Sequence, residues 1–113
     1  MSTTAIPFHV PETGATSWLE AVRLRVSAHM LRRLLARMPV NTRLRTDLGD
    51  VLALLKRHAE AIQQYEMSLR LNPQQPGARL RCGVAHLALG QPAQALLCFN
   101  EAVKQSPRDA EAH

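Results

Sequence analysis

The fold is decided by TRLRTDLGDVLALLKRHAEAIQQYEMSLRLNPQQ at residues 42–75, whose pattern returns in PGARLRCGVAHLALGQPAQALLCFNEAVKQSPRD at residues 76–109. Matching residues lie 34 positions apart: Leu48-Gly49 and Cys82-Gly83, Ala61 and Ala95, Tyr65 and Phe99, Asn72-Pro73 and Ser106-Pro107. A fixed period of this size is typical of helical solenoids, in which one unit cannot bury its apolar face alone. The sequence therefore predicts stacked helical hairpins.

Apolar residues recur at helical spacing along several segments, and each segment is long enough for a helix. We predict helices over Trp18–Met38, Thr42–Leu55, His58–Leu71, Pro76–Leu89 and Pro92–Gln105. Asn41 or Thr42 suits the start of the second helix, and Gly90 suits the end of the fourth. The usual signs of strands are absent from the sequence. The predicted fold class is all-α: a short α-α solenoid of about two helical hairpins, preceded by an extra N-terminal amphipathic helix.

The same pattern divides the chain into an arm, a helix and repeats. We predict a flexible arm (1–16), an amphipathic basic helix (17–39), two repeats (42–75 and 76–109) and the start of a further, unfinished repeat (110–113). Pro39 stands 34 positions before Pro73, so the basic helix is interpreted as the second half of a degenerate repeat.

The basic helix carries an apolar stripe. The stripe consists of Leu19, Val22, Val26, Met30, Leu34 and Met38, widened by Leu31 and Leu35. Arginines lie mostly beside it. Because a solenoid covers its apolar faces, we expect this stripe to pack on the repeats or on a second copy of the chain.

Glycine and a ring-bearing residue occupy the same positions in both repeats. A glycine such as Gly49 or Gly83 costs about 1 kcal/mol inside a helix, and the close approach of a neighbouring helix accounts for keeping it. Tyr65 and Phe99 place a large ring at the centre of each helix pair.

Because glycine, alanine, an aromatic ring and proline recur at these positions, the chain resembles a tetratricopeptide-repeat protein. The resemblance rests on Leu48-Gly49, Ala61, Tyr65 and Pro73, and then on Cys82-Gly83, Ala95, Phe99 and Pro107. The departures are Arg45 and Arg79 for an early aromatic residue, His86 for a bulky apolar one and Lys56 for a turn glycine. The resemblance implies a right-handed superhelix whose first helices line a concave groove.

The resemblance also implies which residues meet a partner in that groove. They are Arg43, Asp47, Asp50, Leu54, Leu80, Arg81, Val84 and Leu87, with Thr46 exposed among them. Chaperone-binding members hold a terminal carboxylate with Lys, Asn and Arg, but only Arg81 matches that clamp here, so we do not expect it. Leu54, Leu80, Val84 and Leu87 form an apolar strip that suits an amphipathic helix or an extended apolar peptide. Alternatively, helix 18–38 fills the groove and makes the strip part of the core.

The residue pattern gives no sign of catalysis or of a bound metal. Cys82 and Cys98 form no CxxC pair, and the histidines show no HxxxH spacing. Cys82 or Cys98 with His86 is the only conceivable pair of nucleophile and base. Cys82 and His86 lie four positions apart and could meet on one helix face, but no third orienting group is visible. We expect a protein that is not an enzyme, with no catalytic residues, no metal, no cofactor and no small-molecule substrate.

The chain has a formal net charge of +5, from 14 Lys and Arg against 9 Asp and Glu. Such a charge serves solubility, or it favours anionic surfaces. The Arg-rich helix 18–38 contains only Trp18 as an aromatic residue, so packing is favoured over a membrane or nucleic acid. The N-terminus has no apolar signal region, and no apolar run reaches the length of a membrane span, so we expect a cytoplasmic protein.

Together these features favour a protein–protein interaction module, a scaffold or adaptor. It binds a partner peptide or helix in the concave groove, associates with itself, or does both. Leu96, Leu97 and Val103 would lie on an uncovered face of the last helix, which indicates an oligomer or a longer repeat array. Two alternatives stay open: the N-terminal regulatory segment of a larger enzyme, and a binder of anionic surfaces through helix 18–38.

Overall fold

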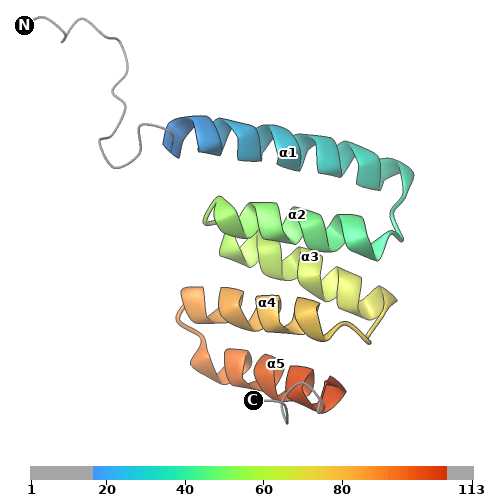
Figure 1. The fold of residues 1–113 in the computed structure, drawn as a ribbon, viewed down its shortest axis with the longest axis vertical. Coiled ribbons are helices and arrows are strands. Elements are labelled where there is room, and N and C mark those ends of the chain that lie inside the picture. Colours follow the sequence, from blue (N-terminus) through green and yellow to red (C-terminus); the bar gives the residue numbers. More distant parts are fainter. Residues whose placement is uncertain (1–16, 107–113) are drawn as a thin grey trace, which may run out of the picture.

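The computed structural model describes residues 17–106 as a stack of helices (Figure 1). They are α1 (Ser17–Arg37), α2 (Thr42–Leu54), α3 (His58–Leu71), α4 (Pro76–Ala88) and α5 (Pro92–Gln105). Residues 17–106 contain no strand. The predicted all-α solenoid is therefore confirmed, and the helix ends lie within about one residue of those expected. The arm predicted for 1–16 and the unfinished repeat at 110–113 lie outside the described residues.

Local signals in the sequence fix the helix ends. Asn41 caps α2, because its Oδ1 accepts a hydrogen bond of 3.0 Å from the Leu44 N–H. Pro76 and Pro92 stand in the first turns of α4 and α5, where a backbone N–H would be unpaired anyway. Gly90 follows α4 with a φ of 74°, a left-handed conformation that glycine adopts without steric cost.

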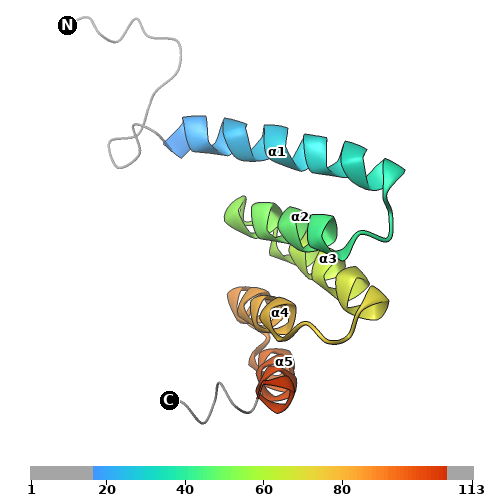
Figure 2. The same cartoon turned by 45° about the vertical axis from the view of Figure 1, so that its right-hand side comes forward.

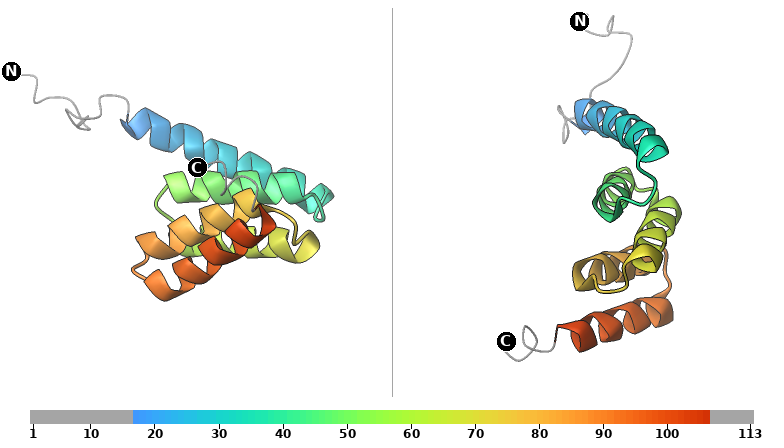
Figure 3. Two further views of the ribbon diagram at one scale, coloured as in Figure 1. Left: turned by 60° about the horizontal axis from the view of Figure 1, so that its bottom comes forward. Right: turned by 90° about the vertical axis from the view of Figure 1, so that its right-hand side faces the viewer.

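Helices that follow each other in the chain pack against each other, so α1 and α5 lie at opposite ends of the stack (Figures 1 and 2). α2 pairs with α3 and α4 pairs with α5, as two hairpins, and α3 also packs on α4. The first helices of the two hairpins, α2 and α4, lie on one side of the stack and contact each other (Figure 3, right). This arrangement places one row of side chains from each of them along a shared face.

Each hairpin closes where an aromatic ring meets a glycine. A Cβ atom added to Gly49 would lie 2.6 Å from a ring carbon of Tyr65. One added to Gly83 would lie 2.5 Å from a ring carbon of Phe99. Both separations are far shorter than van der Waals contact, so only glycine lets these helices come so close. The predicted role of the two glycines is confirmed.

A buried pair of hydroxyl groups joins the first hairpin to α4. The Oγ atoms of Thr46 and Ser68 lie 3.1 Å apart, and both lie within hydrogen-bond distance of the carbonyl oxygen of Thr42. Gln75, which precedes α4, donates from Nε2 to the Ser68 carbonyl at 2.9 Å. The prediction that Thr46 is exposed in the groove is therefore wrong. Its short side chain reaches a carbonyl one turn back and satisfies its hydroxyl inside the core.

α1 packs on α2 with the flank of the predicted stripe rather than with its centre. Ala28 and Leu35 are buried in the core, and Leu31 packs against it. The predicted stripe instead stays 40–58% exposed at Leu19, Val22, Val26, Met30, Leu34 and Met38. Leu31 and Leu35, which widen the predicted stripe, do pack on the repeats, whereas its six central residues do not. Packing of those six residues on a second copy of the chain remains a prediction. Both faces of α1 are apolar, and the small side chain of Ala28 lets α2 approach more closely than valine and methionine would.

We expect Gly83→Ala to destabilise the chain by about 1–3 kcal/mol, because the added methyl group collides with the Phe99 ring. Gly77→Ala is the matched control on the same helix, since a Cβ there meets nothing within 4 Å and alanine favours the helix. Urea unfolding followed by circular dichroism measures both variants. Equal stability of the two would contradict the close approach at Gly83.

Lys56 lies in the loop between α2 and α3 with a φ of 66°, a left-handed conformation that residues with a side chain rarely adopt. It stands 34 positions before Gly90, which does the same work without a side chain. We expect Lys56→Gly to raise the free energy of unfolding by about 0.5–1 kcal/mol. Lys104→Gly inside α5 should lower it by about 1 kcal/mol. A thermal unfolding series compares them, and a less stable Lys56→Gly variant would show that Lys56 is not strained.

Candidate functional site

A groove of about 440 Å³ opens between α2 and α4, with side chains of α3 at its base. We call it the α2–α4 groove. Its lining residues are Asp50, Ala53, Leu54, His58, Tyr65, Leu80, Arg81, Val84 and Ala85. Residues one helical turn apart, such as Asp50 and Leu54 on α2, point to the same side of their helix. The contact between the two first helices therefore brings two such rows to the same groove.

The walls of the groove are apolar and accessible. Leu54 is 65% exposed, Leu80 is 47% exposed and Val84 is 59% exposed. Single exposed apolar side chains are ordinary on protein surfaces, but several that share one hollow are a feature of interaction sites. Covering them would contribute about 25 cal/mol for each Å² removed from water.

Tyr65, Asp50 and Arg81 form a polar chain at the base of the groove. The Tyr65 hydroxyl donates to Asp50 Oδ1 at 2.6 Å, and Arg81 Nη1 lies 3.5 Å from Asp50 Oδ2. Burial raises the pKa of Tyr65 above its ordinary value, and the hydrogen bond to Asp50 raises it further. Tyr65 therefore keeps its proton at neutral pH and remains a donor. Because both Asp50 oxygens are engaged, the groove does not present a free carboxylate.

His58 adds an unsatisfied polar group to the wall of the groove. It is the first residue of α3, and its Nδ1 is buried without a hydrogen bond to the described residues. The ring therefore has hydrogen-bonding capacity that the described part of the chain does not use.

Five of the eight predicted partner-binding residues line the groove: Asp50, Leu54, Leu80, Arg81 and Val84. Arg43, Asp47 and Leu87 do not line it, although Arg43 and Leu87 are exposed. The sequence analysis missed Ala53, His58, Tyr65 and Ala85. Alanines and a central ring are read from a helical pattern as packing residues, and only the packed structure shows that they also form the base of a groove. Binding of a partner by these residues remains a prediction.

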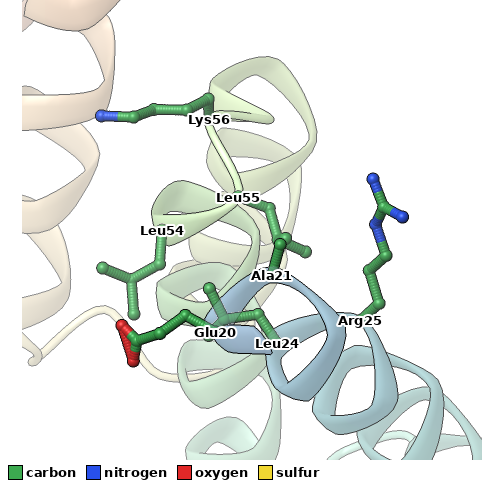
Figure 4. A pocket seen from close by; sticks show the side chains of 7 residues that line it. All are labelled: Glu20, Ala21, Leu24, Arg25, Leu54, Leu55 and Lys56. Carbon is green, nitrogen blue, oxygen red and sulfur yellow. The ribbon is translucent and has the colours of Figure 1, made fainter. Parts of the chain in front are cut away.

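A second hollow of about 400 Å³ lies between the start of α1 and the end of α2 (Figure 4). Its lining residues are Glu20, Ala21, Leu24, Arg25, Leu54, Leu55 and Lys56. The side chains of Arg25 and Lys56 extend away from the others in Figure 4. Leu54 lines both hollows, so the accessible apolar surface continues from the α2–α4 groove toward α1.

α1 does not fill the α2–α4 groove. Among the described residues its backbone packs along α2 and makes no close contact with α4 or α5. One long ion pair reaches α3, with Arg32 Nη2 3.3 Å from Glu60 Oε1. The alternative in which this helix buries the apolar strip is therefore wrong for the part of the chain that the structure covers.

The pair of Cys82 and His86 is not arranged for nucleophilic catalysis. Burial raises the pKa of the Cys82 thiol to about 12, and the neighbouring Cys98 adds to the shift. The ring of His86 has a different partner, since its Nδ1 lies 2.7 Å from Gln91 Oε1. A buried thiol that holds its proton at neutral pH is a poor nucleophile. Both cysteines are free thiols.

Two family models, each described as tetratricopeptide repeat, match residues 15–76 and 55–113. The chain belongs to the tetratricopeptide-repeat family. The family predicted from the glycine, alanine, ring and proline positions is thereby confirmed. Membership supports a protein–protein interaction scaffold, and the groove between the first helices of its repeats is the natural candidate site.

Solved structures of MamA resemble this chain. One, "Crystal structure of MamA", is 22% identical with a TM-score of 0.74 and covers 82% of this chain and 54% of the MamA chain. Another, "Crystal structure of MamA protein", is 24% identical with a TM-score of 0.71 and covers 78% and 48%. At these identities the likeness shows the fold alone, and the chain spans about half the length of the MamA chains it matches. No curated protein matches the chain.

None of α1 to α5 combines the length and the apolar character that a membrane span needs.

Proposed function

We propose that this chain is a non-catalytic interaction module that docks an amphipathic helix or an extended apolar peptide in the α2–α4 groove. The observation that carries the proposal is the open apolar wall formed by Leu54, Leu80 and Val84. At the floor of the groove, the Tyr65 hydroxyl and the Asp50 carboxylate already have hydrogen-bond partners. A partner that covers these side chains gains from their burial without breaking the hydrogen bond between Tyr65 and Asp50.

The charges around the groove define which partner it accepts. Asp50 is paired with Arg81 and Tyr65, so it neither attracts a cation strongly nor leaves Arg81 free to clamp a carboxylate. A groove of this kind selects by shape and apolar content, with the half-exposed side chain of Arg81 orienting the partner. An apolar helix face fits this chemistry better than an acidic chain terminus.

The test is a selection of peptide ligands from a displayed random library against the full chain, followed by calorimetric titration of the best binder. We expect Leu80→Glu with Val84→Glu to weaken binding at least tenfold, because the charged side chains lose solvation on docking. Leu97→Glu, on the exposed side of α5, is the matched control and should bind like the wild type. Unchanged helicity by circular dichroism shows that each variant folds.

Two results would remove the proposal: a selection that enriches no ligand, or a ligand whose affinity survives the Leu80 and Val84 substitutions. A variant that loses helicity would contradict the exposure of these side chains. Leu54→Glu then provides an independent test, since it is the most exposed of the three.

Self-association is a second candidate, and the outer apolar faces of the terminal helices favour it. On α5, Leu96, Leu97 and Val103 are all at least half exposed, and on α1 the predicted stripe is exposed along its whole length. Contiguous apolar faces of this kind are usually covered in solution. Two unlike faces at opposite ends of a solenoid would give head-to-tail contacts, and one face meeting its own copy would give a dimer.

Light scattering over a concentration series tests this candidate. We expect the mass of the wild-type chain to rise with concentration, and Leu96→Glu with Leu97→Glu or Val26→Glu with Met30→Glu to suppress the rise. An effect of both pairs indicates head-to-tail contacts, and an effect of one pair indicates a dimer through that face. A wild-type chain that stays monomeric at high concentration would contradict self-association.

Fewer observations support the two remaining alternatives, binding to an anionic surface and regulation of a larger enzyme. Arg23, Arg25, Arg33 and Arg37 are exposed on α1, which keeps an anionic-surface role open, whereas Arg32 is engaged with Glu60. Regulation of an enzyme and a cytoplasmic location remain proposals from the sequence.

A further inference from the structure

Three side chains that bind metals in proteins meet between α4 and α5. One ligand atom each of Cys82, His86 and Cys98 lies within 4.8 Å of the other two. Cys82 and His86 stand one turn apart on α4, and Cys98 faces them from α5. Their spacing in the sequence gave no sign of a site, because the third member comes from another helix.

The close approach of the two helices brings the thiols together. Cys82 directly precedes Gly83, and Cys98 directly precedes Phe99, whose ring packs on the glycine. The contact that closes the hairpin therefore also sets the distance between the cysteines. Such a pair is held by the fold rather than by a flexible loop.

The first hairpin shows what these positions need for packing alone. The residues 34 positions earlier are Leu48, Leu52 and Gln64. The two leucines are fully buried, and Gln64 accepts a hydrogen bond from Arg45. The second hairpin replaces all three with metal-binding residue types while it keeps the glycine and the ring. Packing does not require this set, since the first hairpin does without it.

The surroundings also suit a metal. Gln91 Oε1 lies 2.7 Å from His86 Nδ1, and an amide oxygen can only accept, so Nδ1 carries the proton and Nε2 keeps a lone pair. Histidines that bind metals commonly donate their other nitrogen to such an oxygen. Arg79, which corresponds to Arg45, has lost its glutamine partner, and its Nε is buried without a hydrogen bond to the described residues.

We propose that Cys82, His86 and Cys98 bind one thiolate-preferring metal ion, Zn²⁺ fitting the donor set best, with the fourth position open to water or an external ligand. Two sulfurs and one imidazole are donors that Zn²⁺ accepts. A tetrahedral Zn²⁺ with bonds of about 2.3 Å to sulfur and about 2.0 Å to nitrogen places its ligands about 3.5–3.8 Å apart. The three atoms, now within 4.8 Å of one another, need to close by about 1.3 Å at most. Binding releases the two thiol protons to solvent and ties α5 to α4.

The experiment uses the full chain, reduced and kept without oxygen, and Co²⁺ as a spectroscopic probe for Zn²⁺. We expect one equivalent of Co²⁺ to give a thiolate-to-cobalt charge-transfer band that Zn²⁺ removes. Cys98→Ser should abolish the band, and His86→Gln should weaken the affinity at least tenfold. Gln91→Ala should weaken it about tenfold through the histidine orientation. His29→Gln, an exposed histidine on α1, is the matched control and should bind like the wild type.

A second measurement keeps the test independent of folding in the variants. Zn²⁺ should raise the Tm of the wild type and of His29→Gln, because it binds the folded state, and should raise the Tm of His86→Gln less. A wild-type chain without the charge-transfer band would overturn the proposal, as would a His86→Gln variant that binds as tightly as the wild type. Rapid disulfide formation in a chain that takes no Co²⁺ would overturn it too and would assign the thiols to redox chemistry.

Discussion

The contact between an aromatic ring and a glycine backbone sets the geometry of both hairpins. At Gly49 and Gly83 the facing ring occupies the space in which a Cβ would stand, so the helix pair closes to a distance that no other residue allows. The groove depends on this spacing, because Tyr65 is at once the ring that packs on Gly49 and the base of the groove. The distance between Cys82 and Cys98 depends on the second contact as well, because these cysteines directly precede Gly83 and Phe99.

The same ring links the core to the groove electrostatically. The hydroxyl of Tyr65 emerges from the packed ring and engages Asp50, and Asp50 in turn holds Arg81 across the gap between α2 and α4. The three polar groups at the floor of the groove are thereby paired with one another. The groove is left with apolar walls and with the charges of Asp50 and Arg81 opposing each other. Its selectivity therefore rests on shape and on burial more than on charge.

Much of the fold follows from the 34-residue period, because spacing alone identifies the helices, their pairing and the glycine–ring contacts. α1 shows where such inference fails. Its two faces are both apolar, and periodicity cannot say which of them meets α2 when Ala28 rather than the larger stripe makes the contact. The predicted exposure of Thr46 is wrong for a related reason, since its burial depends on Ser68 from another helix. The groove was predictable in part: Asp50, Leu54, Leu80, Arg81 and Val84 lie on the face of the first helices that the family resemblance turns toward it, whereas His58 and the alanines line it only because of how the helices pack.

The hydroxyl pair of Thr46 and Ser68 belongs to the first hairpin alone, because the residues 34 positions later are Leu80 and Ala102. The two hairpins share a backbone plan but are not interchangeable modules. A chain with the hairpins in reversed order would place Val84 and Asp47 where Asp50 and Arg81 now meet, and would lose the ion pair between the two hairpins. The order of the units is thus written into their side chains, which gives this solenoid a direction that its near-symmetry would otherwise hide.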